Sequence, residues 1–203
     1  MTVHWRSARA AFLAHSTELR AFLAYSVIVF RPGAAPPKHP QAAPSGPQRV
    51  PAGWKPEEYE VYIDEARRNM DGQLADKRDI RARAQIILTT TLVLGGAIAT
   101  SLTSKGDVST LGQILYLLAT GLTGLTALAS GGLITAQAAI GGPNVQALLL
   151  QESGMVRQRL ADEYAASRHE GAATVAMLVT VLRDCVLALL LGAGALGIAH
   201  VWS

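Results

Sequence analysis

The chain has 203 residues, of which half are hydrophobic and only 16% are charged, and its formal net charge is +3. Neither Ala84–Leu102 nor the stretch between Val108 and Gln151 contains Asp, Glu, Lys or Arg. About 20 uncharged, mostly apolar residues suffice to cross the roughly 30 Å hydrocarbon layer of a bilayer as a helix. The composition therefore predicts an all-α, integral membrane helical protein and leaves no room for a sizeable water-facing core. Because excess Lys and Arg normally flank membrane spans on the cytoplasmic side, no nucleic-acid partner is expected.

The first 55 residues divide into two segments. Residues 1–30 predict a basic amphipathic segment, ending in the apolar run Ala21–Phe30, which is about half the length of a span. A signal peptide is the alternative, but Arg31-Pro32-Gly33 stands where a small-residue cleavage site is needed, so an interfacial helix or a dispensable extension is favoured. Residues 31–55 contain seven prolines and predict a linker, because such dense proline removes backbone donors. The change of composition after this linker leaves open a translation start later than Met1.

Residues 56–83 predict a cytoplasmic amphipathic helix. Pro56 suits the first turn, and acidic residues follow it where the helix dipole is positive. Apolar residues recur at spacings of three and four, which indicates one buried stripe. The end of this helix is basic, and we interpret it as a candidate collar for an anionic ligand or lipid, formed by Lys77, Arg78, Arg81 and Arg83.

Residues 84–140 predict a transmembrane hairpin. Its first span is Ala84–Leu102, its second runs from about Thr110 to Ile134, and the short polar turn at Lys105-Gly106-Asp107 requires an antiparallel arrangement. Small residues recur at every fourth position of both spans, a common device for close packing of helices in lipid. The candidate packing residues are Gly95, Ala99, Thr123, Ala127 and Gly131.

The C-terminal part repeats the pattern of a charged helix that leads into a span. After Gly141-Gly142-Pro143, which should break the helix, residues 144–171 predict a second cytoplasmic amphipathic helix, and residues 172–203 predict a C-terminal transmembrane helix. Arg183-Asp184 interrupts this apolar run. We place this charge pair at the membrane interface, because about 18 residues then remain to cross and a charge near the bilayer centre is costly. The alternative is that the pair lies inside a longer buried helix.

Basic residues flank the spans on one side. They precede the first and third spans and follow the second, whereas the turn between the first two spans has only Lys105. The positive-inside rule then predicts a multi-pass protein of the cell inner membrane with a cytoplasmic N-terminus. The apolar stripes of the two cytoplasmic helices must be buried against each other, as in a coiled coil, or against copies in neighbouring subunits.

No strong catalytic signature is present. The sequence lacks a phosphate-binding Gly-x-x-x-x-Gly-Lys-Ser/Thr, a His-Glu-x-x-His and a Gly-x-Ser-x-Gly motif. A single cysteine, Cys185, excludes a multi-cysteine metal site. We therefore expect no enzyme, no cofactor and no metal. The uncharged spans also disfavour an ion-coupled transporter.

Residues 56–202 resemble the Pycsar-type membrane effectors. The similarity rests on Asp71-Gly72-Gln73-Leu74 and on Asp79-Ile80-Arg81-Ala82, which lead directly into a two-span hairpin, and on a second charged helix before a final span. The resemblance implies anti-phage defence, in which a cyclic nucleotide triggers an oligomer that damages the inner membrane. Arg81 stands where the family commonly has Lys, and no cyclic-nucleotide-binding domain is recognisable. The alternative function is a non-enzymatic membrane anchor whose cytoplasmic helices bind a partner protein.

Overall fold

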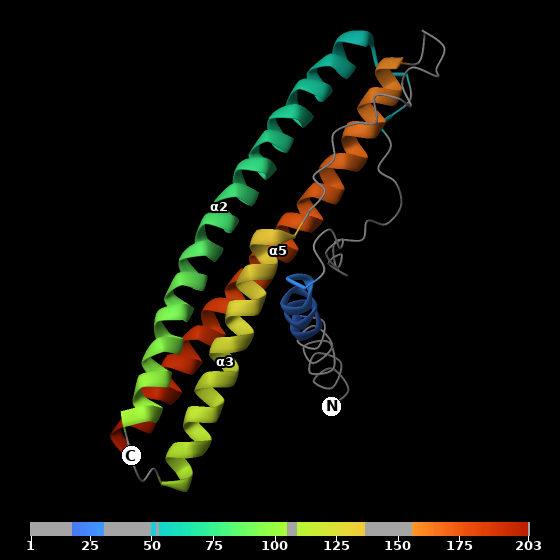
Figure 1. The fold of residues 1–203 in the computed structure, drawn as a ribbon. Coiled ribbons are helices and arrows are strands. Elements are labelled where there is room, and N and C mark those ends of the chain that lie inside the picture. The colour runs from blue at the N-terminus through green and yellow to red at the C-terminus, as the bar shows by residue number, and fades with distance from the viewer. Residues whose placement is uncertain (1–17, 31–49, 52, 105–108, 137–155, 203) are drawn as a thin grey trace, which may run out of the picture. The chain divides into compact units, whose positions relative to one another are not determined.

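The computed structural model describes residues 18–30, 50–51, 53–104, 109–136 and 156–202, and the regular structure in these ranges is α-helical (Figure 1). Residues 18–28 are helical, and three long helices follow: α2 (Pro56–Ser104), α3 (Thr110–Thr135) and α5 (Val156–Trp202). Each of the three long helices contains an apolar stretch that can cross a bilayer. The chain is an all-α membrane protein with three candidate spans, which confirms the predicted fold class.

The chain forms two compact units. In its described part, the unit that we call the membrane unit contains residues 18–30, 80–104, 109–136 and 178–202. The second, the charged unit, contains residues 50–51, 53–79 and 156–177. The expected turn at Lys105, the expected helix break at Gly141–Pro143, most of the Pro-rich linker and the first part of the predicted second cytoplasmic helix lie outside the described residues.

α2 is one uninterrupted helix of 49 residues. It starts where the sequence predicts, with Pro56 in its first turn and the backbone N–H of Lys55 donating to Glu58 Oε2 at 2.7 Å. At about 1.5 Å per residue it extends about 74 Å, so one helix provides both the charged segment and the span that the sequence analysis listed separately. Its buried positions are spaced by three, four or seven residues and comprise Tyr59, Ile63, Ala66, Met70, Gln73, Ile80, Ala84, Ile87, Thr91 and Ile98.

The charged unit is built around a parallel pair of helical segments. Apolar residues of α2 (Tyr59, Ile63, Ala66 and Met70) pack with residues of α5 (Ala161, Tyr164 and Ala165). Glu60 pairs with Arg157 at 3.0 Å, and farther along both helices Gln73 Nε2 donates to the Arg168 carbonyl oxygen at 2.9 Å. Because the contacts advance in the same direction along both helices, the segments are parallel. The two amphipathic stripes are therefore buried against each other within one chain.

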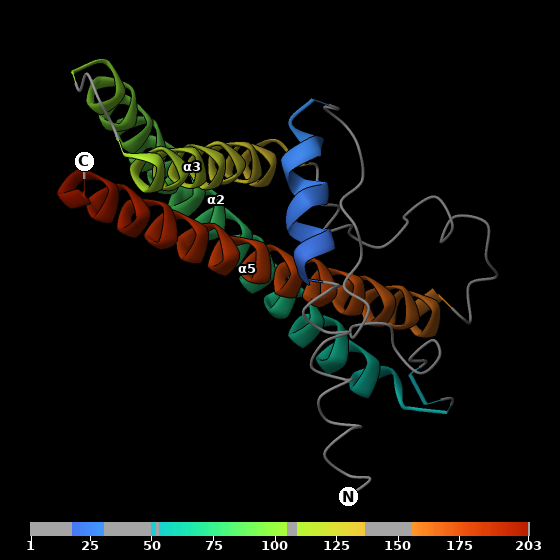
Figure 2. The ribbon, with the colours of Figure 1, turned by 90° about the horizontal axis from the view of Figure 1, so that it is seen from below.

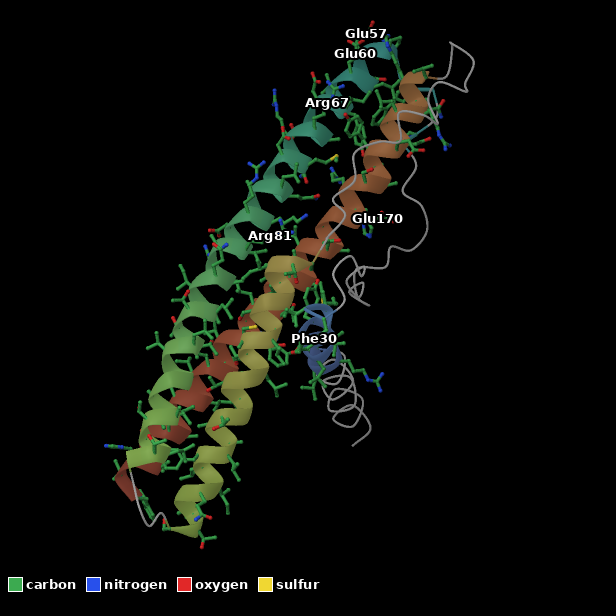
Figure 3. All side chains as sticks on the ribbon, viewed as in Figure 1. Phe30, Glu57, Glu60, Arg67, Arg81 and Glu170 are labelled. Carbon is green, nitrogen blue, oxygen red and sulfur yellow. The ribbon has the colours of Figure 1, made fainter. Side chains whose placement is uncertain are left out.

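Polar contacts fix the register of this pair. Arg67 Nε donates to the Tyr164 hydroxyl at 3.0 Å, and the guanidinium lies 5.7 Å from the centre of the Tyr164 ring (Figure 3 labels Arg67). This hydrogen bond to Tyr164 raises the pKa of the Arg67 guanidinium. Val50 is tied to the same unit, since its N–H donates to Asp162 Oδ1 at 2.8 Å. These links join residues that are about a hundred positions apart in the sequence.

The core of the membrane unit is made of small residues and a few larger ones. One cluster combines Ile98 of α2, Tyr116 and Ala119 of α3, and Ala195 and Ala199 of α5. Ser109 caps α3 by accepting a hydrogen bond from the Gly112 N–H, and its hydroxyl donates to the Trp202 carbonyl oxygen at 3.2 Å. The outer faces of the same helices expose large apolar side chains, including Leu92, Val93, Leu117, Leu190 and Leu191. Exposed apolar faces on spanning helices are the surface that lipid covers.

The short helix of residues 18–28 lies across the membrane unit, from α5 to the end of α3 (Figure 2). Glu18 contacts Arg183 of α5, while Tyr25 and Val29 lie against two glycines of α3. Tyr25 is fully buried, and its backbone carbonyl is so close to Gly132 that no Cβ fits there. Glycine at position 132 is thus a condition for this crossing.

Candidate functional site

All three spans meet at Thr123. A Cβ built on Gly95 of α2 would lie 3.9 Å from Thr123 Cγ2, and one built on Gly192 of α5 would lie 3.4 Å from Thr123 Oγ1. The same built Cβ on Gly192 would lie 3.6 Å from the Ala119 carbonyl oxygen. Two of the predicted packing residues, Gly95 and Thr123, are therefore brought together. Their joint contact with α5 depends on a glycine that the sequence analysis did not single out.

The signal for Gly192 is present in the sequence. Small residues recur along α5 at alternating steps of three and four, as Cys185, Ala188, Gly192, Ala195 and Ala199. This spacing keeps one narrow face toward the partner helices. Small residues at every fourth position mark the first two spans, whereas in the third span the steps alternate between three and four.

The other predicted packing residues have different surroundings. Ala99 is exposed, and the neighbouring Ile98 faces the core instead. Ala127 is half-buried. Gly131 lies beside the short N-terminal helix, because a Cβ at this position would be 3.2 Å from Cγ2 of Val29. The small-residue face of α3 thus serves two kinds of neighbour, the other spans and the turn at residues 29–30.

The inward face of α3 carries hydroxyl groups without hydrogen-bond partners. Tyr116 and Thr123 are buried, and neither hydroxyl has a partner among the described residues. Ser130 is seven residues farther along and fully buried; its hydroxyl lies beside the Cys185 thiol without a well-formed hydrogen bond. The Tyr25 hydroxyl of the short helix is also buried and unpaired. We call Tyr116, Thr123 and Ser130 the hydroxyl row.

Neighbouring threonine hydroxyls, unlike those of the hydroxyl row, are hydrogen-bonded to the backbone of their own helix. Thr120 and Thr126 each donate to the carbonyl oxygen four residues earlier, Tyr116 and Leu122 respectively, at 2.8 Å. Thr91 of α2 does the same to Ile87 at 2.6 Å. A buried hydroxyl left without a partner costs about 1–3 kcal/mol. Thr123 carries this cost although its neighbours on the same helix avoid it.

The charge pair Arg183-Asp184 is part of a three-residue cluster. Arg183 Nη2 lies 3.2 Å from Asp184 Oδ1 and 3.1 Å from Glu18 Oε2 of the short helix. Arg183 is 55% exposed, so these ion pairs are screened and contribute little to stability by themselves. Their structural effect is to hold the short helix on α5. Glu18 was not predicted as a partner, because 165 positions separate it from Arg183.

The residues of the predicted basic collar lie along one stretch of α2 and differ in their exposure and their contacts. Arg81 is half-buried, and its Nη2 donates to the Ala136 carbonyl oxygen at 2.8 Å, at the C-terminal cap of α3. A cation suits this position, because the C-terminus of a helix is negative. Lys77 is half-buried and Arg83 is exposed, and both take part in further interactions. Arg78 is exposed.

Among the described residues, no group of three or more His, Cys, Asp and Glu side chains is placed to hold a metal ion. No family model, no curated protein and no solved structure matches this chain. The hydroxyl row, the Glu18–Arg183–Asp184 cluster and the Arg81–Ala136 cap are therefore interpreted from their chemistry alone.

Proposed function

We propose that this chain is a multi-pass effector of a bacterial defence or signalling system that makes the inner membrane permeable when its spans repack. The observation that carries the proposal is the hydroxyl row, which runs along the inward face of α3 at positions 116, 123 and 130. The protein would act by a change in the packing of its helices, without catalysing a reaction. The resemblance of residues 56–202 to Pycsar-type effectors agrees with this function.

The hydroxyl row favours repacking over simple anchoring. In the packed bundle each unpaired hydroxyl costs about 1–3 kcal/mol, and this cost disappears when the hydroxyl meets water. Separation of α3 from α5 at Gly192 would place Thr123 on the wall of an aqueous path. A helix bundle that serves only as an anchor gains nothing from unpaired hydroxyls in its core. The packed state is thus less stable than an all-apolar core would make it, which lowers the free energy needed to open it.

A signal on the cytoplasmic side can reach the spans through two continuous helices. α2 and α5 both begin in the charged unit and end in the membrane unit. An anion such as a cyclic nucleotide would bind the basic collar (Lys77, Arg78, Arg81 and Arg83) and draw Arg81 away from the Ala136 carbonyl oxygen. The C-terminus of α3 would then lose its cap. Such a ligand opens the bundle only if it binds the open state more tightly than the closed one.

Oligomerisation is proposed from the outward glycines. Gly121 of α3, and Gly194 and Gly197 of α5, have no neighbour within 4 Å of a built Cβ. Glycines on the outer faces of spans allow the backbone of another helix to approach closely. A second copy of the chain is the occupant that the proposal requires, with the positive-inside flanks setting a cytoplasmic N-terminus for every copy.

Dye release from liposomes tests the proposal. Full-length protein is inserted with its charged unit outward, insertion is verified by protease protection, and a panel of 3′,5′-cyclic mononucleotides is added. Wild-type vesicles should leak with at least one of them, and Thr123→Val should reduce this leak because it removes the unpaired hydroxyl. Thr126→Val is the matched control and should leak like the wild type, since the Thr126 hydroxyl is already bonded to Leu122.

Vesicles that stay sealed with correctly inserted protein would contradict the effector function. They would favour the alternative, a membrane anchor whose cytoplasmic helices bind a partner protein. That partner would have to recognise charge, since Val61 is the only large apolar residue that is prominently exposed in the described part of the charged unit. Equal leak from wild type and Thr123→Val would contradict the role of the hydroxyl row while leaving the effector function in place.

A further inference from the structure

The short helix of residues 18–28 has apolar side chains on two opposite faces. One face, with Ala21, Phe22, Tyr25 and Ile28, is buried against the membrane unit. The other exposes Leu19, Leu23, Val27 and Phe30, which are 59%, 43%, 55% and 71% exposed. These four residues recur at steps of four, four and three, so they form one stripe on one side of the helix and its terminal turn. We call them the outer stripe; Figure 3 labels its last member, Phe30.

The position of this helix along the spans is set by its contacts. Glu18 pairs with Arg183, and Trp202, the last residue of α5, lies 19 positions after Arg183. At about 1.5 Å per residue this distance is about 28 Å, close to the roughly 30 Å thickness of the hydrocarbon layer. Its other end meets Gly131 and Gly132, close to the C-terminal end of α3. The helix therefore lies at the level where the bilayer core ends on the Arg183 side.

α5 also exposes apolar side chains near Arg183, the residue that holds the short helix. On α5, Val179, Val186 and Leu187 are exposed on both sides of Arg183 along the sequence. A helix that is apolar on both faces needs protein on one side and an apolar medium on the other. Residues 18–30 are too few to span, but a helix that is packed on protein by one apolar face can place its other apolar face in the interface, about 5–10 Å into the boundary between headgroups and acyl chains.

Charges at the edges of the stripe fit the same environment. Arg20 is exposed and adjoins the outer stripe on the helix surface. A long arginine side chain in this position can keep its stem in apolar surroundings and its guanidinium among lipid phosphates. Glu18 faces the other way and is paired with Arg183, which also pairs with Asp184. No unpaired carboxylate is thus presented to the bilayer by these residues.

We propose that residues 18–30 form an interfacial helix whose outer stripe is inserted into the acyl-chain boundary of the leaflet on the Arg183 side, held to the spans by Glu18–Arg183 and by the close approach of Tyr25 to Gly132. This assigns a fourth contact with the membrane, in addition to the three spans. It is independent of the proposed effector function, because a scaffold would need the same anchoring surface.

Spin-label accessibility in liposomes tests this placement in the full-length chain. Cys185→Ala removes the single native cysteine, and labels are attached after Leu23→Cys or Val27→Cys, both at exposed positions. Leu190→Cys provides the lipid reference on α5, and Val61→Cys provides the water reference in the charged unit, because both native side chains are well exposed. Collision with molecular oxygen, which concentrates in lipid, is compared with collision with a water-soluble nickel chelate.

We expect the labels at positions 23 and 27 to show high oxygen and low nickel collision rates, on the side of the Leu190 reference. Their depth should be shallower than that of Leu190, which is seven residues past Arg183 along α5. Nickel collision rates equal to those at Val61 would show that the stripe faces water and would overturn the proposal. Low rates with both reagents would also overturn it, since they would show that a second copy or a partner protein covers the stripe.

Discussion

Gly132→Ala tests the close approach of the short helix to α3. A Cβ at this position would overlap the Tyr25 backbone carbonyl oxygen, so the short helix has to move by about 1 Å to restore a normal contact. Because the obstacle is backbone, no side-chain rotation relieves the overlap. Overpacking of this kind costs about 1–3 kcal/mol.

Two neighbouring glycines of α3 provide matched controls. A Cβ at Gly124 meets nothing within 4 Å, and one at Gly131 would lie 3.2 Å from Cγ2 of Val29, whose side chain can yield. Alanine is preferred over glycine in a helix interior by about 1 kcal/mol, and this term acts at all three positions. The differences between the variants therefore isolate the steric term. The expected order of stability is Gly124→Ala, then Gly131→Ala, then Gly132→Ala.

The free energy of unfolding is measured by titrating dodecyl sulfate into detergent micelles and following helicity by circular dichroism. Gly132→Ala should be about 1–3 kcal/mol less stable than Gly124→Ala. A spin label at position 23 should also become more mobile in Gly132→Ala, because the short helix is displaced. If Gly132→Ala is as stable as Gly124→Ala and leaves the label unchanged, the short helix does not pack on α3 as described.

Substitutions at three further residues test other contacts. Tyr164→Ala should reduce the stability of the charged unit by about 3–5 kcal/mol, because the packing of the ring is lost. Tyr164→Phe keeps the ring and should change the thermal unfolding of the charged unit only slightly. Equal losses of stability in the two variants would show that the hydroxyl contact with Arg67 dominates. Gln73→Leu removes both the hydrogen bond that Gln73 Nε2 donates to the Arg168 carbonyl oxygen and the buried, unpaired Oε1. Because these two contributions are of similar size and opposite sign, thermal unfolding should change by less than about 1 kcal/mol, and a loss above about 2 kcal/mol would show that the Nε2 hydrogen bond outweighs the cost of burying Oε1. Arg81→Gln should lower the free energy of unfolding by about 1–2 kcal/mol in the same dodecyl sulfate titration, because it weakens the hydrogen bond to the Ala136 carbonyl oxygen. Arg78→Gln, at an exposed position, is the neutral control. Equal effects of the two variants would contradict the capping role of Arg81.

The predicted site was recoverable from the sequence only in part. Gly95 and Thr123 were found because small residues at every fourth position are visible in any uncharged span. Gly192 has a comparable signal in the sequence, because it belongs to a run of small residues at alternating steps of three and four along α5. The hydroxyl row gives no such signal. Whether Thr123 bonds to its own helix, as Thr126 does, depends on a side-chain rotamer that the neighbouring helices select.

Membrane character, helical class and the presence of two amphipathic stripes were determined by the sequence by itself, because hydropathy and its periodicity are local properties that sum along the chain. Only the tertiary structure decided that the charged segments and the spans are continuous in α2 and α5, that the stripes cover each other in parallel, and that Glu18 meets Arg183. These outcomes depend on contacts between residues about 95 to 165 positions apart. The free energy of such contacts comes from shape and distance in the folded chain, and the local pattern of residues does not encode either.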